Sequence, residues 1–331
     1  DYSQLGTLSH ELFHAWNVER IRPAELEPFN FIGANMTPSL WLAEGFTTYY
    51  GDLILKRTNE WDQSKYLNKV ASIVNQSYTM RGRQFFTPEG ASQLATFTDA
   101  GVSKDRTNYR NIFFSYYIYG RAMGLALDLS IRAQFPGKSL DDYMRQLWSD
   151  FGKTETPYTR EDARTTLTKV TGDAVFADKF FAEHIHGQTK PDYAALLAPA
   201  GLTLKQKDSD SAYLGNINFN FEGEAAIVSN SILVGSQLYR AGIERGDRIV
   251  KLGRRTIRSH DLWDKALEQF KPDEITTIEY IQRGERITKQ IAFSSDPALK
   301  VSKLDDEELT DQQKQFLTDW LGEEPIEDVE E

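Results

Sequence analysis

The segment His10-Glu11-Leu12-Phe13-His14 decides both the fold and the chemistry expected of this chain. On a helix, residues four positions apart share one face, so His10 and His14 can present two imidazole nitrogens to the same metal ion. Glu11 then lies beside the metal, where its carboxylate can take a proton from a bound water. The pattern therefore predicts a helix that supplies two ligands and the general base of a catalytic zinc site.

A second segment, Trp41-Leu42-Ala43-Glu44-Gly45-Phe46, can supply the remaining ligand. Catalytic zinc takes three protein ligands and keeps a fourth position for water. Glu44 lies in an apolar run, 39–55, that follows Pro38 and indicates a second buried helix. Because a carboxylate within such a run needs a cation nearby, we predict a site of His10, His14 and Glu44 that binds one Zn²⁺ per chain.

A solvent-exposed amphipathic helix is the alternative to a zinc site, because a His-Glu-x-x-His pattern fixes only three positions and also occurs by chance. Two features favour zinc. Apolar and aromatic residues surround the motif and predict a buried helix, in which histidine and glutamate side chains must be paired or metal-bound. The second motif then provides the missing carboxylate. The apolar neighbours are Leu5, Leu12, Phe13, Ala15, Trp16 and Val18.

Over a longer stretch, the sequence around both motifs resembles the glycyl aminopeptidase family of gluzincin zinc metallopeptidases. The resemblance continues through a C-terminal PDZ-like domain and so covers nearly the whole chain. The family commonly has Lys where this chain has Glu19 and Tyr119. Neither position is a ligand, so these departures concern partner or substrate preference rather than the metal. The segments that carry the resemblance are His10-Glu11-Leu12-Phe13-His14-Ala15-Trp16-Asn17-Val18, Arg20-Ile21-Arg22-Pro23, Trp41-Leu42-Ala43-Glu44-Gly45-Phe46-Thr47-Thr48-Tyr49-Tyr50, Ser115-Tyr116-Tyr117-Ile118-Tyr119-Gly120 and Ala126-Leu127-Asp128-Leu129.

The resemblance implies a second catalytic side chain, Tyr117. Related gluzincin aminopeptidases place a Tyr three residues before a Gly, opposite the metal, where its hydroxyl hydrogen-bonds the oxyanion of the tetrahedral intermediate. Tyr117 and Gly120 match that spacing. A phenol donor aimed at developing negative charge acts mainly in the transition state. The alternative is that Tyr116, Tyr117 and Tyr119 only pack a helix, as clustered aromatic residues usually do.

A partner for a ligand imidazole is also expected, since zinc-bound histidines normally donate their other ring N–H to a carboxylate, a carbonyl or water. Asp52 follows Glu44 by eight residues and is expected near the same helical face. We therefore predict Asp52 as this acceptor. The alternative is a solvated aspartate.

The motifs and the resemblance together imply zinc-dependent peptide hydrolysis, in which Glu11 activates the zinc-bound water. An aminopeptidase is the first expectation. The alternatives are an endopeptidase that is guided to its substrates by the PDZ-like domain, and a peptide-binding scaffold with little activity. In the resembled family, an upstream β-rich lobe covers the cleft and upstream groups help to bind the amino terminus of the substrate. We expect this chain to lack both, so no residue here supports a preference for glycine.

We expect a multi-domain α+β protein with three regions. Residues 1–200 indicate a mainly helical lobe that matches the helical lobe of a thermolysin-like catalytic domain, without its upstream part. Looser segments with Gly and Pro fall at 19–37 and 82–108. The expected helices span 3–18, 38–57, 60–80, 109–135, 139–151, 159–170 and 174–187.

Short strand-like runs broken by Gly and Asp indicate a small β-rich domain at residues 203–296. Its segment 241–253 resembles PDZ domains, which take peptide C-termini as an added strand and hold the carboxylate on loop N–H groups. The equivalent loop is Tyr213-Leu214-Gly215, so the domain binds peptide C-termini or, alternatively, only docks within the chain. The expected strands are Ala225–Val228, Arg248–Leu252, Thr276–Gln282 and Ile287–Phe293, with one helix capped by Ser259.

Acidic residues concentrate at the C-terminus. Residues 305–331 hold 12 Asp and Glu against Lys314, which accounts for the whole net charge of −11 and leaves the rest of the chain neutral. This distribution argues against nucleic acid as a partner, because phosphate binding needs a basic face. Within 297–331, Thr310 and Gln313 form a capping-box pattern. We therefore expect a short helix docked on the body, followed by a disordered acidic end from about Glu323.

The absence of cysteine excludes thiol catalysis, disulfides and sulfur-ligated zinc. No run approaches the roughly 18 uninterrupted apolar residues of a membrane span, so none is expected. The chain starts at Asp1 rather than Met, shortly before His10, so we expect a cleavage point or a boundary within a longer protein. We favour the periplasm or cell envelope over the cytoplasm.

Overall fold

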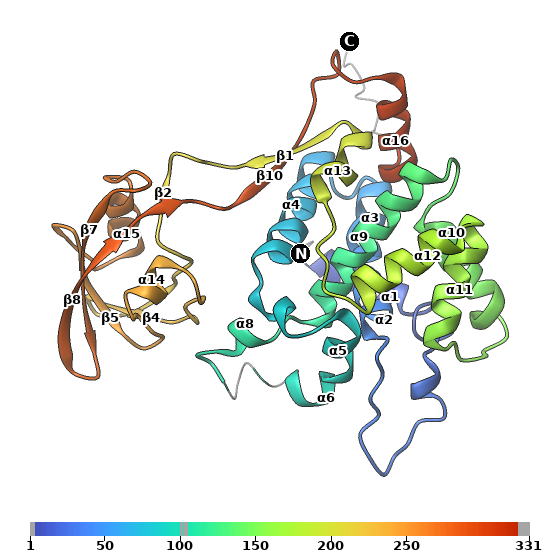
Figure 1. The fold of residues 1–331 in the computed structure, drawn as a ribbon, viewed down its shortest axis with the longest axis horizontal. Helices are drawn as coiled ribbons and strands as arrows, with labels where there is room; N and C mark the ends of the chain where they lie inside the picture. The colour runs from blue at the N-terminus through green and yellow to red at the C-terminus, as the bar shows by residue number, and fades with distance from the viewer. Residues whose placement is uncertain (1–3, 100, 102–104, 324–331) are drawn as a thin grey trace.

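The chain up to residue 200 is built from helices in the computed structural model, which describes residues 4–99, 101 and 105–323 (Figure 1). The α-helices of this helical region are α1 (Leu5–Phe13), α2 (Leu40–Ala43), α3 (Gly45–Arg57), α4 (Gln63–Thr79), α5 (Pro88–Gln93), α6 (Ala95–Thr98), α8 (Tyr109–Ile112), α9 (Tyr116–Gln134), α10 (Leu140–Leu147), α11 (Arg160–Thr171), α12 (Ala174–Phe180) and α13 (Tyr193–Leu197). Shorter turns are 3₁₀-helical at Ala24–Leu26, Arg81–Gln84 and Ala198–Ala200, and π-helical at Trp148–Gly152 and Phe181–Ile185.

Helix α9 is the centre of the helical region. Every residue from Ala122 to Ile131 is buried. A helix that is apolar on all sides must be covered on all sides, and α2, α3, α4, α5, α10 and α13 pack around α9. The elements that carry the two sequence motifs therefore share one hydrophobic core.

Two of the expected helices are interrupted. The run 38–57 forms α2 and α3 with a break at Glu44, and the run 109–135 forms α8 and α9 with an extended connection at 113–115. Apolar periodicity does not reveal such breaks, because apolar residues continue on both sides of each break. Both breaks lie next to residues of the candidate metal centre.

Helix α1 departs most from expectation. It ends at Phe13 and is followed by turns to residue 20, whereas the sequence predicted a helix to residue 18. The predicted burial of this segment was also wrong: Leu8, Leu12 and Trp16 are 62%, 66% and 46% exposed. One face of α1 packs on α3, but nothing in the described part of the chain covers the opposite, apolar face. Apolar composition alone does not distinguish a covered face from an uncovered one.

The β-rich region contains a six-stranded antiparallel sheet. Its order is β3-β4-β5-β7-β8, with β6 beside β5. In the β7–β8 hairpin, both central residues, Arg283 and Gly284, have positive φ, as a two-residue type I′ turn requires. The strands of this sheet are β3 (Phe219–Glu222), β4 (Ala225–Val228), β5 (Arg248–Leu252), β6 (Arg255–Thr256), β7 (Ile275–Gln282) and β8 (Glu285–Ala292), accompanied by α14 (Gln237–Arg240) and α15 (His260–Leu267).

A second hydrophobic core belongs to this sheet. It includes Trp263 of α15 and Tyr280 of β7, both buried. Ser259 caps α15 as expected, its side chain accepting from the backbone N–H of Leu262. The four expected strands are confirmed to within two residues, whereas the short strands β2 (Ala212–Tyr213) and β9 (Ser294–Ser295) and the edge strand β3 were not predicted. The chain is thus a mixed helical and sheet protein with a sheet-rich C-terminal region.

The two regions are joined by an antiparallel ribbon of β1 (Leu202–Gln206) and β10 (Leu299–Lys303). Residues after 297 are therefore no separate tail: β10 returns the chain to the helical region, where α16 (Asp311–Leu321) packs into the first core. Thr310 and Gln313 form the predicted capping box. The acidic end predicted from about Glu323 falls at 324–331, outside the described residues.

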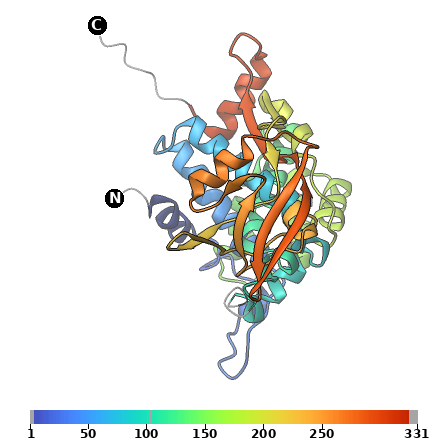
Figure 2. The same cartoon turned by 90° about the vertical axis from the view of Figure 1, so that its left-hand side faces the viewer.

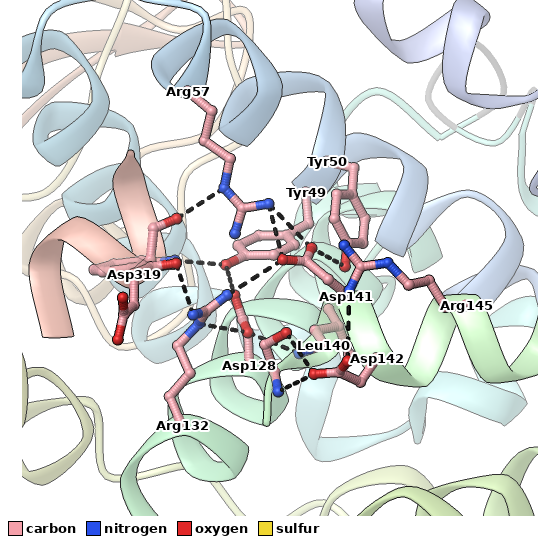
Figure 3. A network of polar contacts seen from close by, with 12 residues as sticks. Tyr49, Tyr50, Arg57, Asp128, Arg132, Leu140, Asp141, Asp142, Arg145 and Asp319 are labelled. Carbon is pink, nitrogen blue, oxygen red and sulfur yellow. Dashed lines mark hydrogen bonds and ion pairs between the residues drawn. The ribbon is translucent and has the colours of Figure 1, made fainter. Parts of the chain in front are cut away.

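A partly buried polar network holds α16 on the helical region (Figure 3). Two carbonyl groups near the C-terminal end of α16 accept hydrogen bonds from arginines: that of Trp320 from Arg57 at 2.8 Å, and that of Asp319 from Arg132 at 2.9 Å. The last carbonyls of a helix have no partner within it, so the arginines satisfy them. The indole N–H of Trp320 also donates to the hydroxyl of Tyr49 on α3, at 2.9 Å. Helix α16 is therefore tied directly to the helix that follows Glu44.

A view from the side places the sheet in front of the helical region, reached through the ribbon (Figure 2). None of the described helices combines the length and the apolar character needed to cross a bilayer.

Candidate metal centre

His10, His14 and Glu44 meet between α1 and the junction of α2 with α3. The Nε2 atoms of the two histidines are 3.0 Å apart, and they lie 3.4 Å (His10) and 3.2 Å (His14) from Oε2 of Glu44. Among the described residues, this is the one group of three His, Cys, Asp or Glu side chains close enough to share an ion. The structure therefore brings the three predicted ligands together.

These separations fit a tetrahedral zinc ion. Ligand atoms held about 2.0–2.1 Å from a tetrahedral ion are about 3.4 Å from one another. Oε2 of Glu44 is also buried, and the ligand imidazoles of His10 and His14 lie within 3.4 Å of it. A buried carboxylate oxygen in that state needs a cation, and two imidazoles with one carboxylate are a donor set that zinc accepts.

Close packing of α1 on α3 places the two histidines. A Cβ on Gly51 would lie 3.2 Å from the backbone nitrogen of His10 and 3.3 Å from its Cα. Glycine at this position lets the two helices approach closely. The ring of Phe13 also stacks on that of Tyr50, with centroids 4.6 Å apart, which fixes the rotation of α1 over α3.

Asn17 links the end of the α1 segment to the turn that carries Glu44. Its side chain is fully buried, and its Nδ2 lies 3.1 Å from the carbonyl oxygens of Leu42 and Ala43 and from Oγ1 of Thr47. Carbonyls at the end of a helix lack partners within it. Asn17 therefore stabilises the break after α2 and so positions Glu44.

The second nitrogen of each ligand imidazole has a partner. Nδ1 of His14 lies 2.7 Å from the carbonyl oxygen of Asn17, and Nδ1 of His10 lies 3.4 Å from Oγ1 of Thr48. Such contacts fix the orientation of the ring and leave Nε2 free for a metal. A carbonyl and a hydroxyl, rather than a carboxylate, fill this role here.

The prediction that Asp52 is this partner was wrong. Its carboxylate pairs with Arg121 at 3.4 Å instead. Eight helical residues at about 100° each leave Asp52 about 80° around the helix from the direction of Glu44, and the break at Glu44 adds a further change of direction. Burial raises the pKa of Asp52, although the charges of Lys69 and Arg121 oppose this shift.

Glu11 and Tyr117 line the same cavity as the three ligands, a space of about 580 Å³. Tyr117 lies in the first turn of α9 and is 37% exposed, with its ring centroid 6.1 Å from that of His10. Burial, with the nearby Glu44 carboxylate, raises the pKa of Tyr117 to about 12. Its hydroxyl is therefore a protonated donor at neutral pH.

The charges of the ligands also suit a cation. Burial raises the pKa of Glu44, but the two imidazoles beside it outweigh burial and lower this pKa to about 2. The hydrogen bond with Glu44 raises the pKa of His14, against the opposing effect of burial. Glu44 is thus an anion at neutral pH, ready to bind a positive charge.

Acidic groups dominate the rest of the cavity. Glu19 and Glu27 line it together with a single arginine, Arg22, and with the apolar side chains of Val18, Leu26 and Phe29. The guanidinium of Arg22 pairs with both carboxylates and also donates to the carbonyl oxygen of Glu19 at 2.9 Å. Its charge is therefore neutralised by the protein itself.

The predicted loop Tyr213-Leu214-Gly215 lies far along the chain, in the β-rich region. Tyr213 pairs with Ser294 in the β2–β9 ladder, and Leu214 is buried in the second core. Gly215 has a φ of +123°, and a Cβ there would lie 2.7 Å from that of Ser236. The side chain of Leu214 is therefore not available to a ligand, whereas Tyr213 stays partly exposed.

The roles of Asn17, Thr48 and Gly51 could not be predicted from sequence patterns, because each acts through contacts with residues distant in the chain. Asn17 and Thr48 do lie within two of the segments that carry the family resemblance. Their position in those segments is the one signal that could have pointed to them.

Comparison with known protein families finds a match for the part of the chain that contains the candidate metal centre. A family model for M61 glycyl aminopeptidase matches residues 3–123, which include His10, Glu11, His14, Glu44 and Tyr117. The resemblance to the glycyl aminopeptidase family is confirmed over these residues. No curated protein matches the chain.

Solved structures extend the comparison to the fold. An aminopeptidase N family protein from Idiomarina loihiensis has a TM-score of 0.82 and 22% identity, over 96% of this chain and 54% of that one. The likeness covers both regions and shows a shared fold, and the chain spans about half the length of this relative. An HtrA-type protease with a decapeptide matches 27% of the chain and 30% of its own at 13% identity, with a TM-score of 0.25, too low to carry an argument.

Proposed function

We propose that this chain contains the catalytic helices of a zinc-dependent peptidase, of the gluzincin kind, that acts as an aminopeptidase. The observation that carries the proposal is the meeting of His10, His14 and Glu44 at tetrahedral spacing, with Glu11 in the same cavity. The match of residues 3–123 to the M61 glycyl aminopeptidase model supports it. The packing of helices around α9 supports a thermolysin-like lobe.

Each residue of the site has a separate role in the proposed hydrolysis. A zinc ion held by His10, His14 and Glu44 would act as a Lewis acid on the scissile carbonyl and would lower the pKa of a bound water to about 7. Glu11 accepts a proton from the attacking water and then delivers it to the leaving amine. The hydroxyl of Tyr117 donates to the carbonyl oxygen as negative charge develops there. The products are an amino acid and a shorter peptide.

The charge of the cavity supports an aminopeptidase. Glu11, Glu19, Glu27 and Glu44 line it against Arg22, so one carboxylate charge stays in excess even with a Zn²⁺ ion bound. The α-amino group of a peptide is a cation near neutral pH, and a cavity with excess carboxylates attracts it. Since the guanidinium of Arg22 is already paired with two glutamates, it is not free to bind the C-terminal carboxylate of a short peptide.

Zinc content tests the metal site. Elemental mass spectrometry on chelator-washed, zinc-reloaded protein should give one zinc per chain, and Glu44→Ala should lose it. Glu11→Gln should keep zinc but abolish turnover; loss of zinc in that variant would refute its role as the base. Glu25→Gln is the matched control, because Glu25 accepts a hydrogen bond from Thr37 and does not line the cavity.

Blocked peptides test the mode of cleavage. Paired substrates with a free or an acetylated amino terminus separate an aminopeptidase, which cleaves only the free form, from an endopeptidase, which cleaves both. Folded, zinc-loaded protein that cleaves neither would favour a peptide-binding scaffold.

For the β-rich region we propose a PDZ-like fold, spanning 203–296. Strand β3 lies at one end of the sheet order, and an open edge of this kind can accept a peptide C-terminus as an added strand. Contacts of residues 231–234 with the helical region support the alternative of docking within the chain. Titration with C-terminally free and amidated peptides distinguishes the two.

A further inference from the structure

The β-rich region touches the helical region directly at α8, apart from the ribbon that connects the two. Asn111 is 4% exposed, and its Nδ2 donates to the carbonyl oxygen of Ile232 at 3.0 Å. Its Oδ1 accepts from the backbone N–H of Val234 at 2.9 Å. Beside this pair, the hydroxyl of Ser231 donates to the carbonyl oxygen of Arg106 at 2.8 Å. One buried amide thus holds two backbone groups of the other region.

On the far side of this contact, Asn230 continues the hydrogen bonding into the β-rich region. Its Oδ1 accepts from the backbone N–H of Asn218 at 2.6 Å, and its Nδ2 donates to the carbonyl oxygen of Asn216 at 3.1 Å. Residues 216–218 connect the loop at 213–215 to strand β3. The edge of the sheet and the Asn111 contact are therefore linked through adjacent residues.

Within the helical region, Tyr117 follows Asn111 by six residues. Helix α8 is a single turn without a side-chain cap, and such a turn is unstable on its own. The connection that follows is extended at Phe113 and Ser115. Phe113 and Phe114 are buried, so this connection is held firmly. Because only five residues separate Asn111 from Tyr117, we expect a displacement of Asn111 to reach the first turn of α9.

We propose that Asn111 is a positioning residue: by binding the 231–234 segment, it fixes the chain that leads to Tyr117 and couples the β-rich region to the cavity. The catalytic role of Tyr117 rests on the proposed function, whereas the positioning itself does not. The first test is therefore independent of activity.

Asn75 offers a matched control. Its Nδ2 donates to the carbonyl oxygen of Leu299 at 2.8 Å, and its Oδ1 accepts from the N–H of the same residue at 2.8 Å. Asn75 thus holds β10 to α4 by the same pair of bonds with which Asn111 holds the 231–234 segment. It belongs to α4, no residue of which lines the cavity.

Hydrogen exchange on the full chain tests the positioning. In Asn111→Ala, amides of residues 113–119 should exchange roughly tenfold faster than in the parent. In Asn75→Ala they should exchange at the parental rate. Unchanged protection of 113–119 in Asn111→Ala would overturn the proposal, and so would equal loss in the two variants. If the alanine variant does not fold, Asn111→Asp replaces it in the same measurement. Aspartate keeps the acceptor for the N–H of Val234 but loses the donor to the carbonyl oxygen of Ile232.

Kinetics then test the coupling to Tyr117. Asn111→Ala should lower kcat roughly tenfold or more with little change in KM, whereas Asn75→Ala should not. The double variant Asn111→Ala/Tyr117→Phe should be no slower than Tyr117→Phe alone, because both changes act through one side chain. Additive losses would refute action through Tyr117. If the parent protein cleaves no peptide, the proposed function fails, and the exchange experiment still decides the positioning.

Discussion

Gly45 and Gly120 pack backbone against backbone: a Cβ on Gly45 would lie 2.2 Å from the Cα of Gly120. Glu44 immediately precedes the first glycine, and Tyr117 lies one turn before the second. This contact between the start of α3 and α9 therefore brings the carboxylate ligand and the phenol to the same cavity. Neither glycine has a positive φ, so close approach, and not backbone conformation, explains them.

Substitution of Gly120 should damage the site through this contact. In Gly120→Ala, the new methyl would lie 2.0 Å from the carbonyl oxygen of Trp41 and 2.7 Å from the Cα of Gly45, so the helices must move apart. We expect a loss of about 1–3 kcal/mol in the free energy of unfolding, with weaker zinc binding, measured by urea denaturation and metal titration. Gly6→Ala is the control, because its Cβ would meet no atom closer than 3.9 Å.

Replacement of Asn17 should weaken zinc binding without removing a ligand. Asn17→Ala deprives the carbonyls of Leu42 and Ala43 of a donor and frees the turn that holds Glu44. Changes in residues that orient metal ligands typically cost roughly 10–100-fold in affinity, which competition with a chelator measures. Asn35→Ala, which removes the exposed side-chain hydrogen bonds between Asn35 and Asn30, should leave affinity unchanged. An unchanged affinity in Asn17→Ala would show that α3 alone positions Glu44.

The sequence predicted the metal-ligand group because helix geometry relates His10, Glu11 and His14 over a few residues. Glu44 could be added because an apolar run isolates its charge. Asn17 could not be predicted, since it contacts carbonyls 25 and 26 residues away. The contact of Gly45 with Gly120 leaves no periodic pattern, although the spacing of Tyr117 and Gly120 was recognised from the family resemblance.

For the fold, too, patterns within a short stretch of sequence were predicted and contacts between distant residues were not. Long helices and strands with clear patterns were predicted, including β4, β5 and the cap of α15. The ribbon of β1 and β10 was not, because it pairs residues 202–206 with residues 299–303, and a five-residue strand carries little pattern. The pairing of β10 with β1 returns the chain to the helical region, so that α16 packs there.

Removal of the phenolic hydroxyl tests whether Tyr117 donates a hydrogen bond to the oxyanion in the transition state. Tyr117→Phe keeps the ring beside His10 but loses the donor to the carbonyl oxygen of the substrate. We expect kcat to fall roughly 10²–10³-fold with little change in KM, and zinc content to stay at one per chain. The control is Tyr239→Phe, an exposed tyrosine of α14. A parental kcat in Tyr117→Phe would leave the ring with a packing role only.

The network that holds α16 should make stability depend on acidity. Asp141 accepts a hydrogen bond from the Tyr50 hydroxyl at 2.9 Å and one from Arg57 at 3.0 Å, with Arg132 nearby. Burial alone would raise the pKa of Asp141, but these partners, Arg57 above all, lower it below the usual 3.8. A carboxylate with a lowered pKa stabilises the fold when ionised. Its contribution is therefore complete above about pH 4 and is lost as the pH falls through its folded-state value.

Asp141→Asn should therefore destabilise the protein at neutral pH and cease to do so in acid. We expect a loss of about 1.5–3 kcal/mol in the free energy of unfolding at pH 7, which shrinks as the pH falls below about 4. Urea denaturation of parent and variant at matched pH values measures the difference. Asp261→Asn removes an exposed pair with Lys265 and should cost less than about 0.5 kcal/mol throughout. A difference between Asp141→Asn and the parent that stayed constant down to pH 3 would show that shape, rather than the charge of Asp141, holds α16 in place.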